Sequence, residues 1–224
     1  MEKGEIMKRF IHLTAAVALA LSIVSGPAQA QSKRAGINAG VDFATLGGDI
    51  ADLVGVDPST KTGFSVGAFF GVDVDKMFRI QLNGQYVQKG AKFEESGATV
   101  TFEVPYIELL LPLTMVIPIE SSSITPRLYV GPSLAFEMSC DIKFEEGGTS
   151  DTESCSDAGA PTKSTDYGVF FGVGVDFGLG SGELTLDALY NLGLANLNDF
   201  EGDTDTVKNR NIQILLGYAF LFGN

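Results

Sequence analysis

Large apolar residues alternate with small or polar ones along most of this chain, and residues 166–180 (DYGVFFGVGVDFGLG) show the pattern clearly. Phe171 and Val173 fall on one parity, whereas Gly172 and Asp176 fall on the other. A period of two residues indicates a β-strand whose two faces differ in chemistry. The pattern therefore raises the question of which face points into the protein.

Eight segments of this kind follow one another, and each is long enough to cross a bilayer as a tilted strand of about 9–11 residues. They cover residues 34–45, 62–74, 78–90, 101–116, 125–138, 166–180, 183–194 and 210–222. The fourth segment is the least regular, because it contains Pro105 and Pro112. Prolines inside a strand predict a bulge or a distortion there.

The connections between these segments alternate in length. The long, polar connections cover residues 46–61, 89–100, 139–165 and 195–209. The short ones cover residues 75–77, 117–124 and 179–182. A meander that closes into a barrel places all connections of one parity at the same end. Long loops outside and short turns in the periplasm are typical of outer-membrane barrels.

The composition of the two faces indicates that the polar face lies inside. A soluble barrel carries long Lys and Glu side chains on its wet surface, but the polar face here holds Gly, Asn, Gln, Ser and Asp with almost no Lys. Small side chains fit a narrow eight-stranded interior, and the other face is rich in Ile, Leu, Val, Phe and Tyr. Aromatic residues suited to the lipid boundary lie near strand ends: Phe43, Phe64, Phe136, Tyr167, Phe177 and Phe222.

Strands in lipid must close into a ring, because an open edge would leave backbone N–H and C=O groups unpaired. The sequence therefore predicts an all-β protein, an eight-stranded antiparallel up-and-down transmembrane β-barrel. A soluble, lipocalin-like periplasmic barrel is the alternative, since alternation alone is common to both kinds.

The first thirty residues have the pattern of a signal peptide. Two basic residues precede an apolar run at 11–24 that is short for a membrane helix, and residues 28–30 form an A-x-A cleavage site. A buried N-terminal helix is the alternative. We predict a cleaved signal peptide at residues 1–30, and a single barrel domain at residues 31–224.

Charge and histidine content narrow the function. Once the three basic and two acidic residues of 1–30 are removed, 12 basic and 26 acidic residues remain, a charge of −14. This charge argues against nucleic acid as a partner, because phosphate binding needs clustered Lys and Arg. The only histidine, His12, leaves with the signal peptide, so His-dependent triads and His metal sites are excluded. We predict no enzyme activity, no cofactor and no metal; an enzyme built on Asp/Glu or Ser/Lys pairs is the alternative.

Cys140 and Cys155 lie in one stretch rich in Gly, Ser and Asp. Two cysteines at short spacing in an exported chain predict a loop-closing disulfide, with a reduced pair as the alternative. Acidic residues cluster in the same stretch and in residues 195–209. Neither cluster has the spacing of an EF-hand, so solvated loop charge is the expected role, with Ca²⁺ or Mg²⁺ binding as the alternative.

Charged residues also occur on the face predicted to line the lumen: Arg79, Arg127, Glu108, Asp42, Asp73, Asp176, Glu183 and Asp187. Unpaired buried charges are unfavourable, so we expect several of these residues to pair inside the barrel. Eight strands leave an interior that side chains can fill, which favours a plugged lumen. A narrow path for ions, lined by the same charges, is the alternative.

Five short motifs occur in order along the chain: YVQKG at 86–90, YIELLLPL at 106–113, RLYVGPSLAF at 127–136, LYNLGL at 189–194 and LGYAFLF at 216–222. Together they resemble outer-membrane β-barrel proteins of the PorT-like "porin family". The resemblance implies a small, eight-stranded barrel in the outer membrane of a Gram-negative-type bacterium. It implies no catalytic residues.

Two positions depart from that family's pattern. Leu110 stands where the family often has proline, and the sequence ends Phe222-Gly223-Asn224 instead of on the aromatic residue usual in assembly signals. Phe222 is therefore the candidate for that role. We expect contact with outer-membrane lipid, with lipopolysaccharide and with the outer-membrane assembly machinery, and the extracellular partner is unknown. The predicted function is a non-enzymatic structural or surface-interaction role, with a narrow small-solute pore as the alternative.

Overall fold

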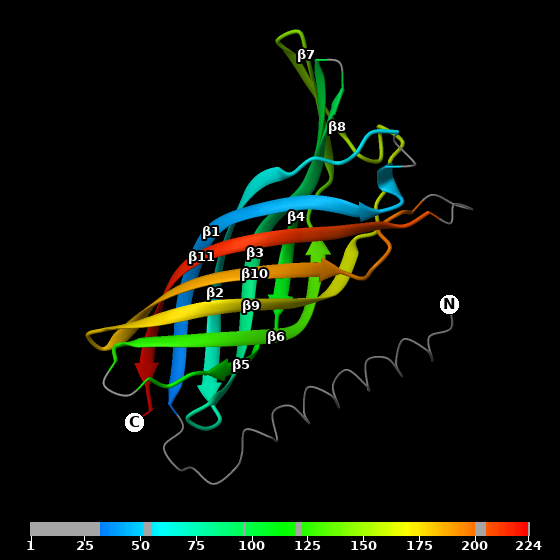
Figure 1. Cartoon of the computed structure of the whole chain (residues 1–224). Coiled ribbons are helices and arrows are strands. Elements are labelled where there is room, and N and C mark those ends of the chain that lie inside the picture. The colour runs from blue at the N-terminus through cyan, green and yellow to red at the C-terminus, as the bar shows by residue number, and fades with distance from the viewer. Residues whose placement is uncertain (1–31, 52–54, 96, 120–121, 200–204, 224) are drawn as a thin grey trace, which may run out of the picture. The chain divides into compact units, whose positions relative to one another are not determined.

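The computed structural model describes residues 32–51, 55–95, 97–119, 122–199 and 205–223, so the predicted signal peptide lies outside the described residues. Among the described residues, no helix has the length and apolar character needed to cross a membrane. Figure 1 labels the strands, which are β1 (Lys33–Gly48), β2 (Lys61–Asp73), β3 (Phe78–Glu95), β4 (Ala98–Leu110), β5 (Leu113–Val116), β6 (Ile124–Glu137), β7 (Asp141–Glu146), β8 (Thr149–Ser154), β9 (Thr165–Leu179), β10 (Gly182–Gly193) and β11 (Val207–Phe222).

Eight strand positions close into a ring of antiparallel neighbours. Starting from β2, the order around the ring is β2, β1, β11, β10, β9 and β6. The next position is shared by β4 and β5, and β3 follows it and pairs with β2. The first and last strands close the ring in a register from Lys33 opposite Phe222 to Gly48 opposite Val207. Positions that are consecutive in the chain are neighbours in the ring. The predicted eight-stranded, up-and-down β-barrel is therefore confirmed.

The fourth strand position is interrupted at a proline. β4 ends two residues before Pro112, and β5 begins directly after it. Proline has no N–H to donate to a ladder, but the carbonyl of Pro112 accepts a hydrogen bond from Gln81 N at 3.1 Å. Leu111 N donates to Pro132 O at 3.2 Å. The ring thus stays hydrogen-bonded across the predicted distortion, whereas Pro105 keeps its place in the β4 register.

Two of the predicted loops contain β-structure. The prediction of a long polar loop at 89–100 is wrong, because β3 continues to Glu95 and β4 begins at Ala98. Within residues 139–165, β7 and β8 form a hairpin, and β7 also pairs with β4. Polarity alone does not exclude a strand: beyond a bilayer both faces of a sheet meet water, and charged residues can stand beside strand-forming Val, Phe and Thr.

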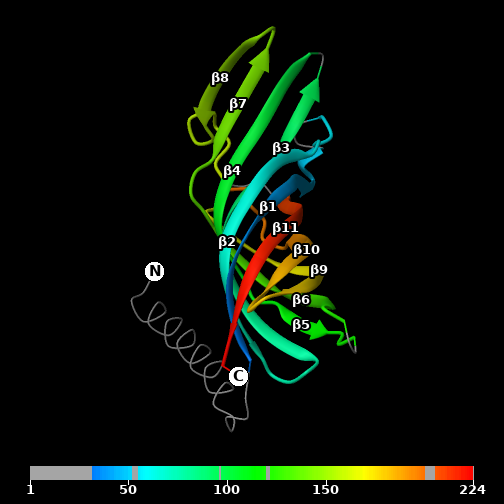
Figure 2. The same cartoon turned by 90° about the vertical axis from the view of Figure 1, so that its left-hand side faces the viewer.

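We call residues 90–103, together with β7 and β8, the β-extension. Figures 1 and 2 show it projecting beyond the barrel wall. The end of the barrel from which it projects is the loop end, where the long connections also lie. The opposite end is the turn end, and it carries the short connections at residues 74–77, 117–123 and 180–181.

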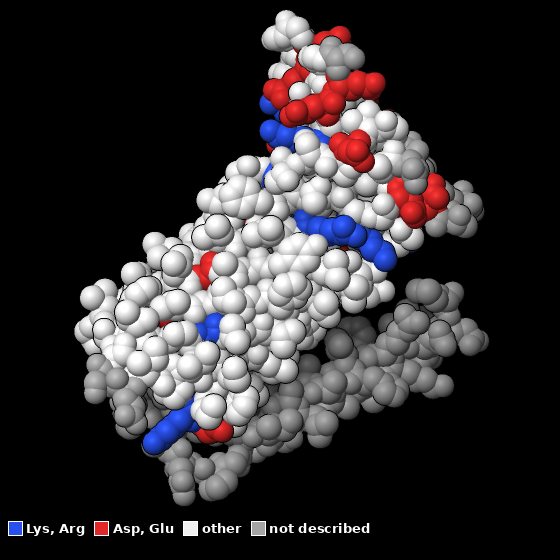
Figure 3. All heavy atoms as spheres, viewed as in Figure 1, with Lys and Arg blue, Asp and Glu red and all other residues white. Residues whose placement is uncertain are grey.

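The barrel is apolar outside and polar inside. Along β11, Ile212, Ile214 and Leu216 are each about half exposed, whereas Asn211 and Gln213 are buried. In Figure 3 the barrel flank is almost free of charged side chains, and acidic residues gather on the β-extension. A continuous exposed apolar surface of this kind belongs in lipid. The predicted arrangement of the faces is confirmed, and it favours a membrane barrel over a soluble one.

Candidate functional site

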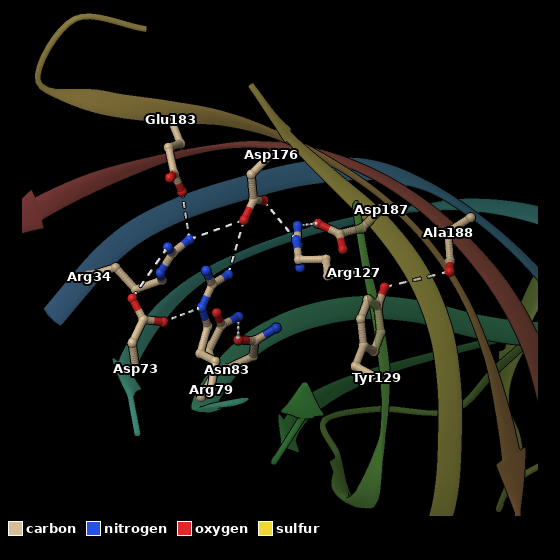
Figure 4. Close-up of polar contacts among 11 residues, drawn as sticks. Arg34, Asp73, Arg79, Asn83, Arg127, Tyr129, Asp176, Glu183, Asp187 and Ala188 are labelled. Carbon is tan, nitrogen blue, oxygen red and sulfur yellow. Dashed lines mark hydrogen bonds and ion pairs between the residues drawn. The ribbon is translucent and has the colours of Figure 1, made fainter. Parts of the chain in front are cut away.

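The lumen near the turn end holds seven charged side chains in mutual contact, and we call them the turn-end charge cluster. They come from β1, β2, β3, β6, β9 and β10, so the cluster spans the bore (Figure 4). Its members are Arg34, Asp73, Arg79, Arg127, Asp176, Glu183 and Asp187.

Asp176 lies at the centre of this cluster and contacts three arginines. Its Oδ2 accepts hydrogen bonds from Arg79 Nη1 at 3.0 Å and from Arg34 Nη1 at 3.3 Å. Its Oδ1 accepts from Arg127 Nε at 2.7 Å. The Asp176 side chain is only 1% exposed, and such charge-assisted hydrogen bonds are stronger than neutral ones. Asp176 therefore ties β1, β3 and β6 to β9.

Each arginine of the cluster also pairs with a second carboxylate. The pairs are Arg79–Asp73 at 2.7 Å, Arg34–Glu183 at 2.7 Å and Arg127–Asp187 at 2.8 Å. A guanidinium presents several N–H groups in one plane, so a single arginine can bridge two carboxylates. The result is a continuous ionic network across the bore.

The structure brings six of the eight predicted lumen charges into the turn-end charge cluster, while Asp42 and Glu108 lie elsewhere in the lumen. Sequence reasoning missed Arg34, which stands at the very start of the first predicted segment. Its parity is that of Gly36 and Asn38. Arg34 could have been found by extending the alternation to the first residue of the strand.

A second buried group lies toward the loop end, and we call it the loop-side polar cluster: Gln85, Lys89, Glu108, Asp166, Asn191, Asn209 and Gln213. Lys89 Nζ lies 2.7 Å from Glu108 Oε1 and 3.6 Å from Asp166 Oδ2. Glu108 also accepts hydrogen bonds from Gln85 Nε2 at 2.7 Å and from Asn191 Nδ2 at 2.8 Å. One lysine and several amides therefore hold the buried carboxylates here, although Asp166 Oδ1 has no hydrogen-bond partner among the described residues.

Lys89 is another lumen residue that sequence reasoning missed, because it falls at the edge of the predicted loop 89–100. Its parity matches that of Arg79 and Gln85 on the same strand. Asp42, expected to join a charge network, has no ion pair with any side chain that the structure describes. Instead its Oδ1 accepts a hydrogen bond from Asn211 Nδ2 at 2.6 Å.

An apolar layer crosses the lumen between these two groups. It consists of Leu110, Tyr129, Phe170, Leu189 and Leu215, which come from five different strands. Every member is at most 7% exposed. The prediction of mainly small, polar side chains in the lumen does not hold at this level. The alternation does place Phe170 inside, with the parity of Asp176, but its apolar character makes it easy to pass over.

Glycines make room for the large side chains that cross the bore. A Cβ added to Gly172 would lie 2.5 Å from Cε2 of Tyr129, and one added to Gly174 would lie 2.5 Å from Asp187 Oδ1. Between the turn-end charge cluster and the apolar layer, a cavity of only about 20 Å³ remains. A space of that size holds roughly one water molecule. The lumen is thus filled by its own side chains at this depth.

The predicted disulfide is confirmed, since Cys140 and Cys155 are bonded with their Cα atoms 5.3 Å apart. The two cysteines flank the β7–β8 hairpin, and Cys155 N donates to Cys140 O at 2.9 Å. Hairpin residues 141–154 hold five acidic residues and one lysine. In the described parts of the acidic loops, no three His, Cys, Asp or Glu side chains are grouped so as to hold a metal ion.

Asp49 links two connections at the loop end, beyond the end of β1. Its Oδ2 accepts hydrogen bonds from Thr206 N and from Thr206 Oγ1, both at 2.9 Å. These hydrogen bonds, the backbone one foremost, hold the pKa of Asp49 below its usual value. Asp49 is therefore a partly exposed carboxylate with a defined partner, in contrast to the buried carboxylates of the lumen.

Phe222, the candidate assembly aromatic, is the last residue of β11 and is 44% exposed. Its ring centroid lies 6.3 Å from that of Phe70 on the outer surface. Exposed aromatic rings near strand ends suit the boundary between lipid and water. The role of Phe222 in assembly stays a prediction.

A comparison with protein families identifies the family to which this barrel belongs. The family model described as "Outer membrane protein beta-barrel domain" matches residues 16–220. The chain belongs to this family. As an outer membrane protein beta-barrel domain, it resides in the bacterial outer membrane, in agreement with its apolar flank. No curated protein has a matching sequence.

Several solved barrels match this domain at low sequence identity. Neisserial surface protein A is 16% identical with a TM-score of 0.48, over 84% of this chain and 97% of that chain. Ail, the attachment invasion locus protein of Yersinia pestis, is 15% identical with a TM-score of 0.41, over 84% and 99%. The outer membrane protease OmpT of Escherichia coli is 9% identical with a TM-score of 0.31, over 87% and 98%. Similarities this low transfer no activity.

Proposed function

We propose that this outer-membrane barrel is a non-enzymatic surface protein that anchors the β-extension in the membrane. The observation that carries the proposal is the filled lumen, in which the turn-end charge cluster, the apolar layer and the loop-side polar cluster follow one another along the bore. A filled eight-stranded lumen favours an anchoring role over transport.

The chemistry of the lumen supports a non-enzymatic role. Residues 31–224 hold no histidine, and the buried carboxylates of Asp176 and Glu108 are each held by several donors. A general base or nucleophile needs a substrate beside it. The lumen cavity between the turn-end charge cluster and the apolar layer is about 20 Å³, too small for one. The larger hollows that touch Arg79, Arg127 and Asp187 are lined mainly by apolar residues. These carboxylates therefore act as structural ties.

The β-extension supports a role at the membrane surface. β3 and β4 continue into it directly from the barrel wall, and the disulfide joins residues 15 apart at the base of its hairpin. Closing a loop of that length stabilises the ordered form by about 3 kcal/mol. A preorganised surface loses less entropy on binding. The β-extension is therefore suited to contact a partner outside the membrane.

Orientation is the first test of this proposal. Gly147 and Gly148 form an exposed turn with φ values of 57° and 84°, and such loop tips tolerate insertions. An epitope inserted between them should be stained by antibody on intact cells. The control carries the epitope at residues 75–76, in a short turn of the other end, and should stain only after permeabilisation. Staining of the control on intact cells would reverse the proposed orientation.

Outer-membrane lipid and lipopolysaccharide are the proposed partners of the apolar flank, and the assembly machinery is the proposed partner of Phe222. In Phe222→Ala we expect fewer folded barrels in membrane fractions, measured by heat-dependent gel mobility. Phe220→Ala is the matched control, because Phe220 is an exposed aromatic residue on the same strand. Equal assembly of the two variants would remove Phe222 from this role.

A further inference from the structure

The described residues line an apolar pocket of about 310 Å³, partly open to solvent, at the loop end of the barrel, which we call the loop-end pocket. Phe102 and Val104 of β4 line one side of it. Ala160, from the connection before β9, and Leu197, from the connection before β11, line the other. Asn209 of the loop-side polar cluster also borders the pocket, so the pocket lies above the filled part of the lumen.

We propose that the loop-end pocket binds a neutral, mainly apolar small molecule that carries one hydrogen-bond acceptor. Size is the first reason. An apolar cavity of about 150 Å³ holds benzene, so a pocket of about 310 Å³ accommodates roughly a dozen non-hydrogen atoms. Ligand pockets of proteins commonly begin at about 300 Å³.

The lining of the pocket selects an uncharged ligand. Of its twelve described lining residues, nine are apolar or aromatic, and the other three are Thr162, Asn198 and Asn209. None of the twelve carries a charge. An ion placed against such a lining would lose its water without gaining a counter-charge. Anionic headgroups and metal ions are therefore poor occupants.

The walls of the pocket are held in place by contacts within the protein. Thr162 and Asn198 form a β-bridge between the two connections. Lys163 N donates to Leu197 O at 3.0 Å in the same place. On the opposite side, Ile50 belongs to a packed apolar cluster that includes Phe102. A preformed pocket of this kind needs little further ordering when a ligand enters.

Tyr106 supplies the polar contact. It lines the pocket and is 1% exposed. Asn209 Nδ2 donates to the Tyr106 hydroxyl oxygen at 3.4 Å and to Asp166 Oδ2 at 2.9 Å. Among the described residues, no hydrogen bond takes up the proton of that hydroxyl. A buried donor gains by finding an acceptor, which a carbonyl oxygen on the ligand would provide.

The test is a titration of the folded barrel, followed by methyl NMR in detergent micelles and in lipid nanodiscs. With 2-acetylnaphthalene, we expect saturable shifts confined to methyl groups of Ile50, Leu197 and Val207. 2-Ethylnaphthalene has the same shape without the carbonyl and should bind about three- to tenfold more weakly. Tyr106→Phe should abolish that difference. The charged analogue 2-naphthoate should not saturate the site.

Two tryptophan variants make a matched control. Ala160→Trp fills the pocket and should abolish saturable binding, whereas Val130→Trp adds the same side chain to the exposed flank and should leave it unchanged. Unsaturable shifts spread over flank methyl groups such as those of Leu216 would overturn the proposal. Saturable binding in detergent but not in nanodiscs would also overturn it, because a lipid chain would then occupy the pocket in a bilayer. Saturable binding that is retained in Ala160→Trp would likewise overturn the proposal.

Discussion

The turn-end charge cluster and the loop-side polar cluster bury charge in the same narrow lumen by different means. In the first, three arginines surround Asp176 and bridge it to further carboxylates. In the second, Lys89 contacts Glu108, and amide groups from Gln85 and Asn191 complete the carboxylate's hydrogen bonds. Arginine bridges several acids through its planar fork, while lysine acts as a point charge. The two clusters should therefore respond differently when one member is lost.

The largest effect is expected for Asp176→Asn, which removes the charge shared by three buried arginines. Breaking a buried ionic network in this way destabilises by about 3–5 kcal/mol. The measurement is urea unfolding of the barrel in lipid vesicles. Asp73→Asn is the control, because the Asp73 side chain is 22% exposed and lies 2.7 Å from Arg79 but 3.9 Å from Arg34. A loss in Asp176→Asn no larger than in this control would contradict the central place of Asp176.

Lys89→Met should destabilise less, by about 2–3 kcal/mol, because Glu108 keeps its two amide donors. The same urea unfolding measures this loss. Combining Lys89→Met with Glu108→Gln should recover part of it, since the charge of Glu108 is then removed while Asp166 keeps only its hydrogen bond from Asn209. A loss as large as that of Asp176→Asn, without recovery in the double variant, would erase the distinction between the clusters.

Gly172→Ala probes the apolar layer that separates the clusters. The new methyl group would meet the Tyr129 ring at 2.5 Å, and such overpacking destabilises by about 1–3 kcal/mol. Gly84→Ala is the matched control, because its added carbon would meet Leu109 Cδ2 at an ordinary 3.7 Å. Equal urea-unfolding stabilities of the two variants would show that the layer is loosely packed.

The smallest effect is expected at Asp49, a partly exposed carboxylate that provides a baseline for the buried ones. Its pKa is lowered in the folded state, so its link to Thr206 stabilises the loop end above the unfolded pKa of about 3.9. That contribution is lost as the pH falls through the lowered folded-state pKa. The Thr206 amide resonance should titrate with a midpoint below about 3.9, and Asp49→Asn should abolish this titration. A midpoint above that value contradicts the sign of the shift.

Much of the barrel wall is predictable because side-chain direction in a strand has a strict period of two. The parity that sends Ile214 to lipid also sends Gln213 into the lumen. The interruption of the fourth strand is also predictable, because Pro112 cannot donate a hydrogen bond to a ladder. The β-extension is not, since strands that are wet on both faces lose the contrast on which the pattern depends.

The site is predictable only in part. Parity assigns Asp176 and Arg127 to the lumen, but it cannot say that Arg34 reaches the same carboxylate. That contact depends on the stagger of strands around the closed ring, which is a property of the whole barrel. The apolar layer is not predicted from the sequence, for a different reason. A rule that expects polar residues inside passes over Phe170 and Leu189, although their parity places them there.

The central claim is that stacked side chains close the lumen, and planar-bilayer recording of the refolded wild-type barrel tests it most directly. We predict a silent bilayer, without steady single-channel steps, because the layers leave space for about one water at the level of the turn-end charge cluster. Steady steps in the wild type that disappear in Arg79→Ala would contradict the claim and would identify a charged path through the bore.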